Sequence, residues 1–373
     1  MRFQIQEEDG SCAARTGLMS FPSGEVETPI FMPVGTRATV KGLTTEGLRE
    51  CGATMVLANA YHLALRPGPE LVADVGGLHR FMGWDGPILT DSGGYQVFSL
   101  SDLNDVNDDG VEFRSPIDGS LMHLGPREAM RIQEMLGPDV AMVLDECPPY
   151  PCSREDARSA VERTLRWAEQ CQSYHERDGQ ALFAIVQGGV YDDLREFCAE
   201  RLCGREFDGY AIGGVSVGEP DEERRRMAAF TARLLPREKP RYLMGVGFPL
   251  DLLHAVAQGV DMFDCVAPTR MGRNATAFTR YGRVRIRNSC FKRDTRPVEP
   301  TCDCACCRLY SRAYLNHLFR NDEMLGPILL TVHNLTFYHR LMSDARNAIE
   351  EGRFESFRQQ FVSDYLAGKE DSQ

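Results

Sequence analysis

Short apolar runs recur along the first 270 residues and alternate with amphipathic helical patterns. Near-continuous apolar runs are typical of parallel strands that are buried on both faces. Eight runs have this character: residues 28–35, 53–60, 86–94, 139–147, 181–189, 209–218, 241–247 and 260–268. Strand and helix alternating eight times predict an α/β fold with a closed (β/α)8 barrel, the TIM barrel. An open, doubly wound sheet is the alternative that this pattern allows.

Amphipathic helical patterns fill the intervals between these runs. They predict helices at residues 44–51, 125–136, 153–177, 191–202, 221–235 and 249–259. Ser153 and Asp221 begin two of them. Because a short polar side chain at that position accepts a hydrogen bond from the first turn, both residues are expected N-caps.

Two segments break the alternation. Residues 99–124 contain the turn signals Asp-Asp-Gly and Ile-Asp-Gly with alternating residues between them, which predicts a β-hairpin inserted after the third strand. After residue 270, paired strands, a cysteine cluster and a helix from Ser311 are expected. We therefore divide the chain into a barrel (1–270), a subdomain inserted late in the barrel (271–345) and a C-terminal helix and tail (346–373).

A dense group of thiols lies in this subdomain, at Cys302, Cys304, Cys306 and Cys307. Three thiolates and one imidazole make a closed tetrahedral zinc site, which is structural because no coordination position stays open. The candidate fourth ligands are His317, His333 and His339, and spacing alone does not exclude Cys306. Buried thiols without a metal are the alternative. We expect one structural Zn2+, which makes residues 271–345 a C-terminal zinc-binding subdomain.

The net charge of −12 argues, taken alone, against a nucleic-acid partner. Its distribution points the other way: residues 270–312 hold eleven Lys or Arg and three Asp or Glu, a net +8, so the remainder carries −20. A basic stripe on an acidic protein is typical of a phosphate-bearing partner. A solvated surface that offsets the acidic remainder explains the charges equally well.

The N-terminus shows no basic segment followed by an apolar run, and no stretch approaches about 18 apolar residues. A secretory signal and a membrane span are therefore not expected. This predicts a cytoplasmic protein, whose thirteen cysteines stay reduced and serve metal binding or chemistry.

Polar residues end several of the apolar runs. Asp91 ends the third, Asp145 the fourth, Gln187 the fifth, and the eighth runs into Asp264. Any one of these aspartates alone is more simply a helix cap, but strand ends converge at the mouth of a barrel, where active sites lie. Two carboxylates across a pocket suit glycosidic chemistry, in which one attacks the anomeric carbon and the other moves protons.

The remaining groups suit a flat ligand. A third carboxylate beside an amide such as Gln187 can recognise the edge of a planar base. The paired glycines Gly213 and Gly214 would let such a ring approach the backbone closely. Tyr95 and Met244 could lie on its two faces, although packing in the core is the simpler explanation for Met244.

Together these residues resemble the bacterial tRNA-guanine transglycosylases, also called queuine tRNA-ribosyltransferases. The matching motifs span essentially the whole chain: FMPVGT (31–36), LANAYHL (57–63), DSGGYQVFSL (91–100), LDECPPYP (144–151), IVQGG (185–189), GGVSVGE (213–219), MGVG (244–247), GVDMFDCVAPTR (259–270), CxCxxC (302–307) and YSRAYLNHLF (310–319). The resemblance implies an enzyme that exchanges guanine at the wobble position of tRNAs with a GUN anticodon for 7-aminomethyl-7-deazaguanine (preQ1).

The resemblance also implies roles for single residues. Asp264 is the nucleophile that forms a covalent ribosyl-tRNA intermediate, and Asp91 is the general acid/base. The residues implied in base binding are Asp145, Gln187, Gly214, the backbone at Val215, Tyr95 and Met244 on the ring faces, and Ser92, Asn59 and Cys147 in matching motifs. Arg270 and Arg273 match positions that contact the anticodon. The resemblance selects Cys302, Cys304, Cys307 and His333 as zinc ligands, and implies a homodimer.

The chain departs from the family pattern at a few positions. Val215 stands where Leu is usual, Phe248 replaces a polar residue that contacts the tRNA backbone, and Gly272 and Ala275 replace Ala and Gly. Cys147 and Val217 match the bacterial enzymes and favour preQ1, with queuine salvage as the alternative. The residues leave two other functions to weigh: a glycoside hydrolase, which needs neither basic stripe nor zinc subdomain, and a non-catalytic tRNA-binding subunit, which should lack Asp264.

Overall fold

A closed parallel barrel forms the body of the protein. The computed structural model describes residues 1–100 and 105–370. The barrel strands are β4 (Ile30–Met32), β5 (Val34–Gly35), β6 (Val56–Asn59), β7 (Ile88–Asp91), β11 (Val140–Met142), β12 (Ala181–Val186), β13 (Gly209–Ile212), β14 (Arg241–Leu243) and β15 (Met262–Asp264). Each lies within one of the eight predicted runs, which confirms the (β/α)8 prediction.

The first run closes the ring. It forms both β4 and β5, which are separated by Pro33; β4 pairs with β15 and β5 pairs with β6, all in parallel. The strand order β4-β15-β14-β13-β12-β11-β7-β6-β5 therefore begins and ends on the same run. The open-sheet alternative is wrong.

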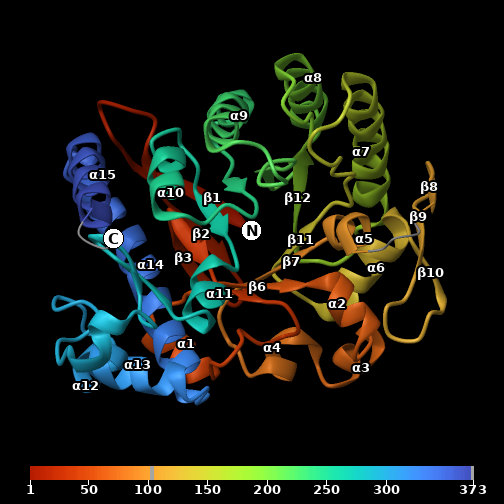
Figure 1. Cartoon of the computed structure of the whole chain (residues 1–373). Helices are drawn as coiled ribbons and strands as arrows, with labels where there is room; N and C mark the ends of the chain where they lie inside the picture. The colour runs from red at the N-terminus through yellow and green to blue at the C-terminus, as the bar shows by residue number, and fades with distance from the viewer. Residues whose placement is uncertain (101–104, 371–373) are drawn as a thin grey trace.

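Helices surround the strands (Figure 1). They are α1 (Thr45–Glu50), α2 (Ala60–Leu65), α3 (Pro69–Asp74), α4 (Gly77–Met82), α5 (Gly94–Leu100), α6 (Pro126–Leu136), α7 (Arg154–Tyr174), α8 (Asp192–Cys203), α9 (Asp221–Leu234), α10 (Pro249–Val256) and α11 (Ala267–Arg273). Ser153 caps α7 as expected, since its side chain accepts from the Asp156 N–H. The Asp221 cap was wrong: Pro220 occupies the cap position, and Asp221 is the first helical residue, where its charge complements the helix dipole.

The expected insertion follows β7. It is a three-stranded antiparallel sheet of β8 (Asp105–Val106), β9 (Val111–Arg114) and β10 (Leu121–Leu124), so the predicted hairpin gains a third, short strand. Residues 101–104 of the predicted range lie outside the described residues. The insertion projects from the side of the barrel beside α5 and α6 (Figure 1).

An antiparallel sheet that we did not predict covers the amino ends of the strands. It consists of β1 (Arg2–Glu8), β2 (Arg15–Phe21) and β3 (Gly24–Thr28). Arg15 donates to both carboxylate oxygens of the buried Asp261, immediately before β15, and Ser23 donates to Asp139, immediately before β11. Because this end of the barrel is covered, the carboxyl ends of the strands are the ones left to form a site.

The C-terminal third adds a second, smaller core. Its elements are β16 (Thr276–Thr279), β17 (Gly282–Arg285), the 3-10 helix η1 (Ser289–Arg293), α12 (Ala305–Leu309), α13 (Arg312–Arg320), α14 (Leu325–Glu350) and α15 (Phe354–Glu370). Helix α14 contributes Leu330 to the small core and Leu335 to the barrel core. The predicted boundary between residues 271–345 and 346–373 falls inside α14, which both cores share. This division stays our proposal. No helix in the described part of the chain is long and apolar enough to cross a membrane.

Candidate active site and metal cluster

Three carboxylates lie at the carboxyl ends of three barrel strands. Asp91 ends β7, Asp264 ends β15, and Asp145 follows β11. Asp91 and Asp145 are only 8% and 6% exposed, while Asp264 is partly exposed. An ionised carboxylate in such a position is costly unless hydrogen-bond donors surround it, so the donors of each group indicate its chemistry.

Asp91 is held by three donors from neighbouring elements. Its Oδ2 accepts from Asn59 Nδ2 and, at 2.7 Å, from Gln96 Nε2, and its Oδ1 accepts from the Ala60 N–H at 2.9 Å. Asn59 and Asp91 are register partners on β6 and β7. Burial, opposed by these donors and assisted by the charge of Asp264, raises the pKa of Asp91 to about 6. A carboxyl group with this pKa can both give and take a proton near neutrality.

Asp264 has both of its donors on one oxygen. Tyr242, on the neighbouring strand β14, donates its hydroxyl to Oδ1 at 2.6 Å, and the Gly245 N–H donates to the same atom at 2.8 Å. Among the described residues, no hydrogen bond reaches Oδ2. Burial raises the pKa of Asp264. One oxygen is therefore fixed and the other is available to react.

Asp145 forms a different kind of group with two neighbours. Gln187 Nε2 donates to its Oδ2 at 2.6 Å, and Ser92 Oγ donates to its Oδ1 at 3.4 Å. Gln187 Oε1 is buried and has no hydrogen-bond partner among the described residues. Burial raises the pKa of Asp145 to about 6. This arrangement leaves an amide acceptor beside a carboxylate, which suits a ligand edge that carries N–H groups.

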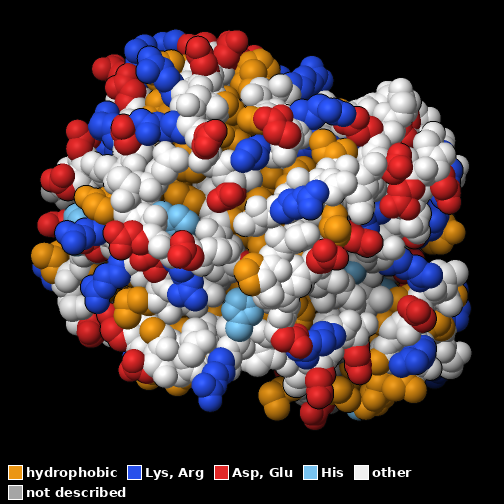
Figure 2. Space-filling view, turned by 180° about the vertical axis from the view of Figure 1, so that it is seen from behind, with side chains coloured by type: hydrophobic (Ala, Val, Ile, Leu, Met, Phe, Trp, Pro, Cys, Tyr) orange, Lys and Arg blue, Asp and Glu red, His pale blue; other side chains and the backbone are white. Residues whose placement is uncertain are grey.

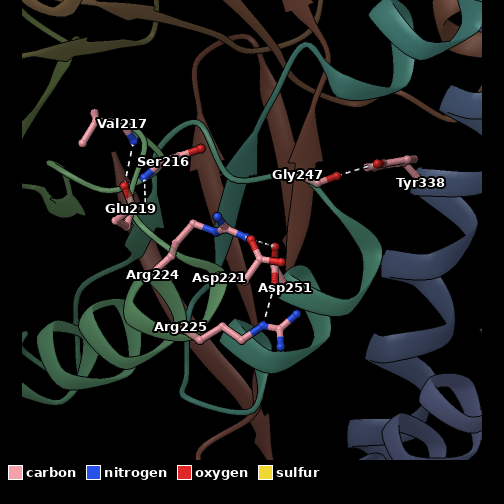
Figure 3. Close-up of polar contacts among 9 residues, drawn as sticks. All are labelled: Ser216, Val217, Glu219, Asp221, Arg224, Arg225, Gly247, Asp251 and Tyr338. Atoms are coloured by element: carbon pink, nitrogen blue, oxygen red, sulfur yellow. Dashed lines mark hydrogen bonds and ion pairs between the residues drawn. The ribbon is translucent and has the colours of Figure 1, made fainter. Parts of the chain in front are cut away.

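The loop after β13 lies against this group. Gly214 has φ +62°, and a Cβ at this position would lie 2.3 Å from Gln187 Oε1, so only glycine fits. Glu219 accepts the backbone N–H groups of Ser216 and Val217 (Figure 3). Since C=O and N–H point in opposite directions across a trans peptide, the Val215 carbonyl points away from Glu219.

The remaining predicted base-binding residues are also at this end of the barrel. Tyr95, in the first turn of α5, is 50% exposed. Met244 follows β14 and is partly buried against the barrel core. Burial raises the pKa of the Cys147 thiol to about 12, with Gly214 and Gln187 among its neighbours. A protonated thiol at this position is a packing group rather than a nucleophile.

The loop after β14 is fixed from two sides. Gly245 donates to Asp264, and the hydroxyl of Tyr338 on α14 donates to the Gly247 carbonyl (Figure 3). Phe248 follows, half-exposed, with its ring 6.4 Å from Phe278 and with the Arg283 guanidinium 5.9 Å from its centroid. The departure at residue 248 therefore places an aromatic surface between the barrel and the β16–β17 hairpin.

The basic stripe is partly neutralised by acidic neighbours. Arg296 and Arg312 pair with Asp294, and Arg280 pairs with Asp364. Arg270 and Arg273, on the short helix α11 directly after β15, have no ion pair among the described residues, and Arg273 Nη1 is buried without a partner. On the face seen in Figure 2, Lys and Arg alternate with Asp and Glu. Arg270 and Arg273, on the helix that follows the strand ending in Asp264, are thus among the stripe cations without an ion pair in the described part of the chain.

The thiol cluster is assembled as expected. One ligand atom each from Cys302, Cys304, Cys307 and His333 lies within 4.8 Å of the others, and all four residues are buried. His333 approaches Cys307 Sγ at 3.3 Å and Cys304 Sγ at 3.8 Å through Nδ1, and its Nε2 lies 2.8 Å from the Phe278 carbonyl. A backbone acceptor on the second ring nitrogen leaves Nδ1 free to bind a metal. This group could hold a metal ion.

The other candidates are not in the cluster. His317 is exposed and close to Asn321, and Cys306 is buried in the small core. His339 is half-buried, and desolvation lowers its pKa to about 4. The sequence left the choice open, and the structure brings one of the three histidines to the thiols.

Several residues around the site were not predicted. They are Tyr242, Gln96, Arg195 and Glu219. Glu219 ends the motif GGVSVGE, and a charged residue in this otherwise uncharged, glycine-containing segment could have been noticed. Tyr242 and Arg195 lie inside a strand and a helix, where nothing local distinguishes them from packing residues.

Comparison with known proteins agrees with the geometry. A family model described as queuine tRNA-ribosyltransferase matches residues 9–367. The chain is 56% identical over 363 residues to the queuine tRNA-ribosyltransferase of Pelotomaculum thermopropionicum, covering 97% of this chain and 98% of that one. It is 53% identical over 368 residues to that of Desulforamulus reducens (99% and 100%), and 56% identical over 355 residues to that of Thermosynechococcus vestitus (95% and 94%).

The pKa of Asp145 predicts how pH changes stability. Because its pKa is raised from 3.8 to about 6, the native state binds this proton more tightly than the unfolded state does, and stability is lost as pH rises from about 4 through 6. Asp145→Asn should therefore raise the free energy of unfolding by on the order of 2 kcal/mol at pH 8, with the gain disappearing near pH 4. Urea unfolding between pH 4 and 8 measures this.

The exposed Asp85, which pairs with Arg49 and has a lowered pKa, provides the control. Asp85→Asn should change stability only slightly and in the opposite sense. An Asp145→Asn protein that is less stable than the unsubstituted chain at pH 8 would contradict the raised pKa of Asp145.

Proposed function

The chain belongs to the queuine tRNA-ribosyltransferase family and is a transglycosylase, and we propose that it exchanges guanine at the wobble position of GUN-anticodon tRNAs for preQ1. The observation that carries the proposal is the difference between the three carboxylates at the carboxyl ends of the strands. Asp264 has one fixed and one free oxygen, Asp91 has a pKa near neutrality, and Asp145 is joined to an amide. They suit a nucleophile, a proton carrier and a base-recognition group.

We infer a double displacement. Asp264 Oδ2 attacks C1′ of the ribose, the C1′–N9 bond breaks, and its electron pair leaves with guanine, which takes a proton from Asp91. The incoming base then returns a proton from N9 to Asp91, its N9 attacks C1′, and Asp264 leaves as the carboxylate. The hydrogen bonds from Tyr242 and Gly245 hold Oδ1 throughout, so that Oδ2 meets C1′ in one orientation.

Base recognition uses the second group of residues. The N–H groups of a guanine edge match the Asp145 carboxylate and the unpaired Gln187 Oε1, with Gly214 and Ser92 close by. The half-exposed Tyr95 ring and Met244 provide surfaces for the two faces of the base. An unpaired buried acceptor supports this role because it is costly unless a ligand uses it.

The incoming base is distinguished by its substituent. Glu219 binds the Ser216 N–H and so leaves the Val215 carbonyl on the opposite side, as an acceptor for the aminomethyl group of preQ1. Cys147 lies by the same loop. Queuine, with its larger substituent, is the alternative base.

The tRNA binds, in this proposal, with its anticodon loop over the barrel mouth. Arg270 and Arg273 lie directly after the strand that ends in Asp264 and are available for phosphates. The target base must leave the stack to reach the carboxylates, which costs less in a single-stranded loop than in a duplex. We place the reaction in the cytoplasm, where tRNA is found and the cluster thiols stay reduced.

We propose that the cluster holds one structural Zn2+. Three thiolates and one imidazole match the preference of this metal, and the four protein ligands leave no open position for chemistry. The ion would hold the segment around α12 against α14, next to the hairpin β16–β17 and its arginines.

We also propose a homodimer, formed through the surface of α12, α13 and the start of α14. The rings of Tyr310 and Tyr314 stack at 5.2 Å, Leu309 is 69% exposed, and Met324 and Ile328 are exposed nearby in the sequence. Figure 2 shows hydrophobic side chains gathered at the lower right, over this part of the molecule. A patch of this kind is typical of an interaction surface.

The covalent step predicts a trapped adduct. Incubated with a GUN tRNA and a base analogue, the unsubstituted protein should give a protein–tRNA band under denaturing electrophoresis, and Asp264→Asn should give none because the attacking oxygen is replaced. Asp344→Asn, which removes a partly buried carboxyl on α14, should still trap. Trapping by Asp264→Asn would refute the assigned nucleophile.

The identity of the incoming base predicts that labelled guanine and preQ1 are both incorporated into the tRNA. Incorporation of queuine in preference to preQ1 would favour the salvage alternative.

The zinc proposal predicts one equivalent of zinc per chain by elemental analysis. Cys304→Ser should lose the metal and lower the midpoint of thermal unfolding, because a ligand is removed. Cys306→Ser, next to the ligands but outside the cluster, should keep the metal. A metal-free preparation with full activity and stability would contradict a structural role.

The dimer proposal predicts a sedimenting species of about twice the chain mass. A double change, Leu309→Glu with Tyr314→Glu, should give monomers, since it places charges in the apolar surface. Leu71→Glu, at an exposed leucine on α3, should leave the dimer intact. An unchanged dimer in the double variant would place the interface elsewhere.

A further inference from the structure

Arg195 is a buried cation with no ion-pair partner among the described residues. It lies in the first turns of α8 and is fully buried. Its guanidinium donates to the carbonyls of Gly189 (2.7 Å), Gly213 (3.0 Å) and Gly214 (3.2 Å) and to Thr231 Oγ1 (3.3 Å). All four acceptors are neutral.

Such an arrangement is costly. A buried charge that is not neutralised by an opposite charge loses its hydration, and a neutral side chain of similar volume would often be more stabilising. Burial lowers the pKa of Arg195 to about 10, which still leaves the group charged at neutral pH. The carbonyls that it binds follow β12 and β13, the strands that bring Gln187 and Gly214 to the barrel mouth.

The hydrogen bonds of Arg195 set the direction of two peptide units. Because N–H points opposite to C=O across a trans peptide, binding the carbonyls of Gly213 and Gly214 turns the N–H groups of Gly214 and Val215 away from the guanidinium. Glu219 binds the next two N–H groups, those of Ser216 and Val217 (Figure 3). A buried cation and a buried anion thus fix four successive peptide units.

The surrounding packing leaves little freedom for other orientations. A Cβ on Gly188 would lie 2.7 Å from Arg195 Cγ and from its backbone nitrogen, and a Cβ on Gly214 would lie 3.5 Å from Arg195 Nη2. Gln187, adjacent to Gly188, carries the unpaired acceptor of the site. Arg195 therefore lies directly behind the residues proposed to contact the base.

We propose that Arg195 is a positioning residue for base recognition: it holds the Gly213–Val215 peptides so that their N–H groups are presented to acceptor atoms on the edge of a purine or deazapurine base. The inference rests on the proposed function. Arg195 itself touches no substrate, and acts through the backbone whose carbonyls it binds.

The test compares Arg195→Met and Arg195→Lys in exchange of radiolabelled guanine into a GUN tRNA. Arg195→Met should raise the KM for guanine by about tenfold or more, because the peptides lose their orientation, and the Kd for tRNA should stay within about twofold. Arg195→Lys keeps the charge with fewer donors, and should restore part of the affinity for guanine. If Arg195 only stabilised the fold, its replacement would reduce the fraction of active enzyme. The apparent kcat would then fall, and the KM for guanine would not change.

Arg241→Met is the matched control. Arg241 is a partly buried arginine whose pKa is also lowered to about 10, and it donates to the Leu235 carbonyl from the start of β14, at the closed end of the barrel. Its replacement should lower the unfolding midpoint with the KM for guanine unchanged.

A guanine KM within twofold of the unsubstituted value in both Arg195 variants, or an equal rise in Arg241→Met, would overturn the proposal. If Arg195→Met does not fold, Arg195→Lys alone decides. Absence of exchange by the unsubstituted protein would instead refute the proposed function.

Discussion

The cost of keeping ionised groups out of water governs this structure. Asp91, Asp145 and Arg195 are almost wholly buried at one end of a barrel, and each would be strongly destabilising without donors or acceptors close by. Their partners come from other elements: Asn59 from β6 for Asp91, and Gln187, after β12, for Asp145. These partners lie on neighbouring strands, β6 beside β7 and β12 beside β11. Closure of the ring through β4 and β5 brings Asp264, at the end of β15, close enough to act on the pKa of Asp91.

The same constraint explains why the two ends of the barrel differ. At the amino end, Asp261 is also buried, but Arg15, on β2, binds both of its carboxylate oxygens. Both side chains of this pair are buried where the sheet β1–β3 covers the barrel. At the carboxyl end, no arginine in the described part of the chain forms an ion pair with the three aspartates. Their hydrogen bonds come from amides, hydroxyls and backbone N–H groups, which orient a carboxylate without taking away its charge.

Much of the barrel could be predicted from the sequence because its signals are local. Eight apolar runs gave eight strand positions, and a carboxylate that ends such a run is visible without knowledge of its neighbours. The sheet β1–β3 was missed, since its strands show no clear apolar face and its burial is set by contact with distant segments. The short helices α2 to α5 and α11 were missed because six or seven residues carry little periodicity, although the equally short α1 was predicted.

The site was predictable in part for the same reason. Asp91 and Asp264 end apolar runs, whereas Tyr242 and Arg195 occupy positions that are ordinary for a strand and a helix. Their partners are 22 residues away for Tyr242, and 18 and 19 for Arg195 on Gly213 and Gly214. Only the fold shows which side chains meet. For the cluster, spacing left three histidines open, and the direction of α14 brings His333 to the thiols.

Helix α14 joins the small core to the loop that orients Asp264. His333, in the thiol cluster, and Tyr338, which donates to Gly247, are five residues apart on this helix, a separation of about 7.5 Å along its axis. Gly247 belongs to the same short loop as Gly245, which orients Asp264. The position of Asp264 is thus linked, through one helix, to the thiol cluster outside the barrel. A small rotation of the subdomain would therefore be transmitted to the orientation of the Asp264 carboxylate.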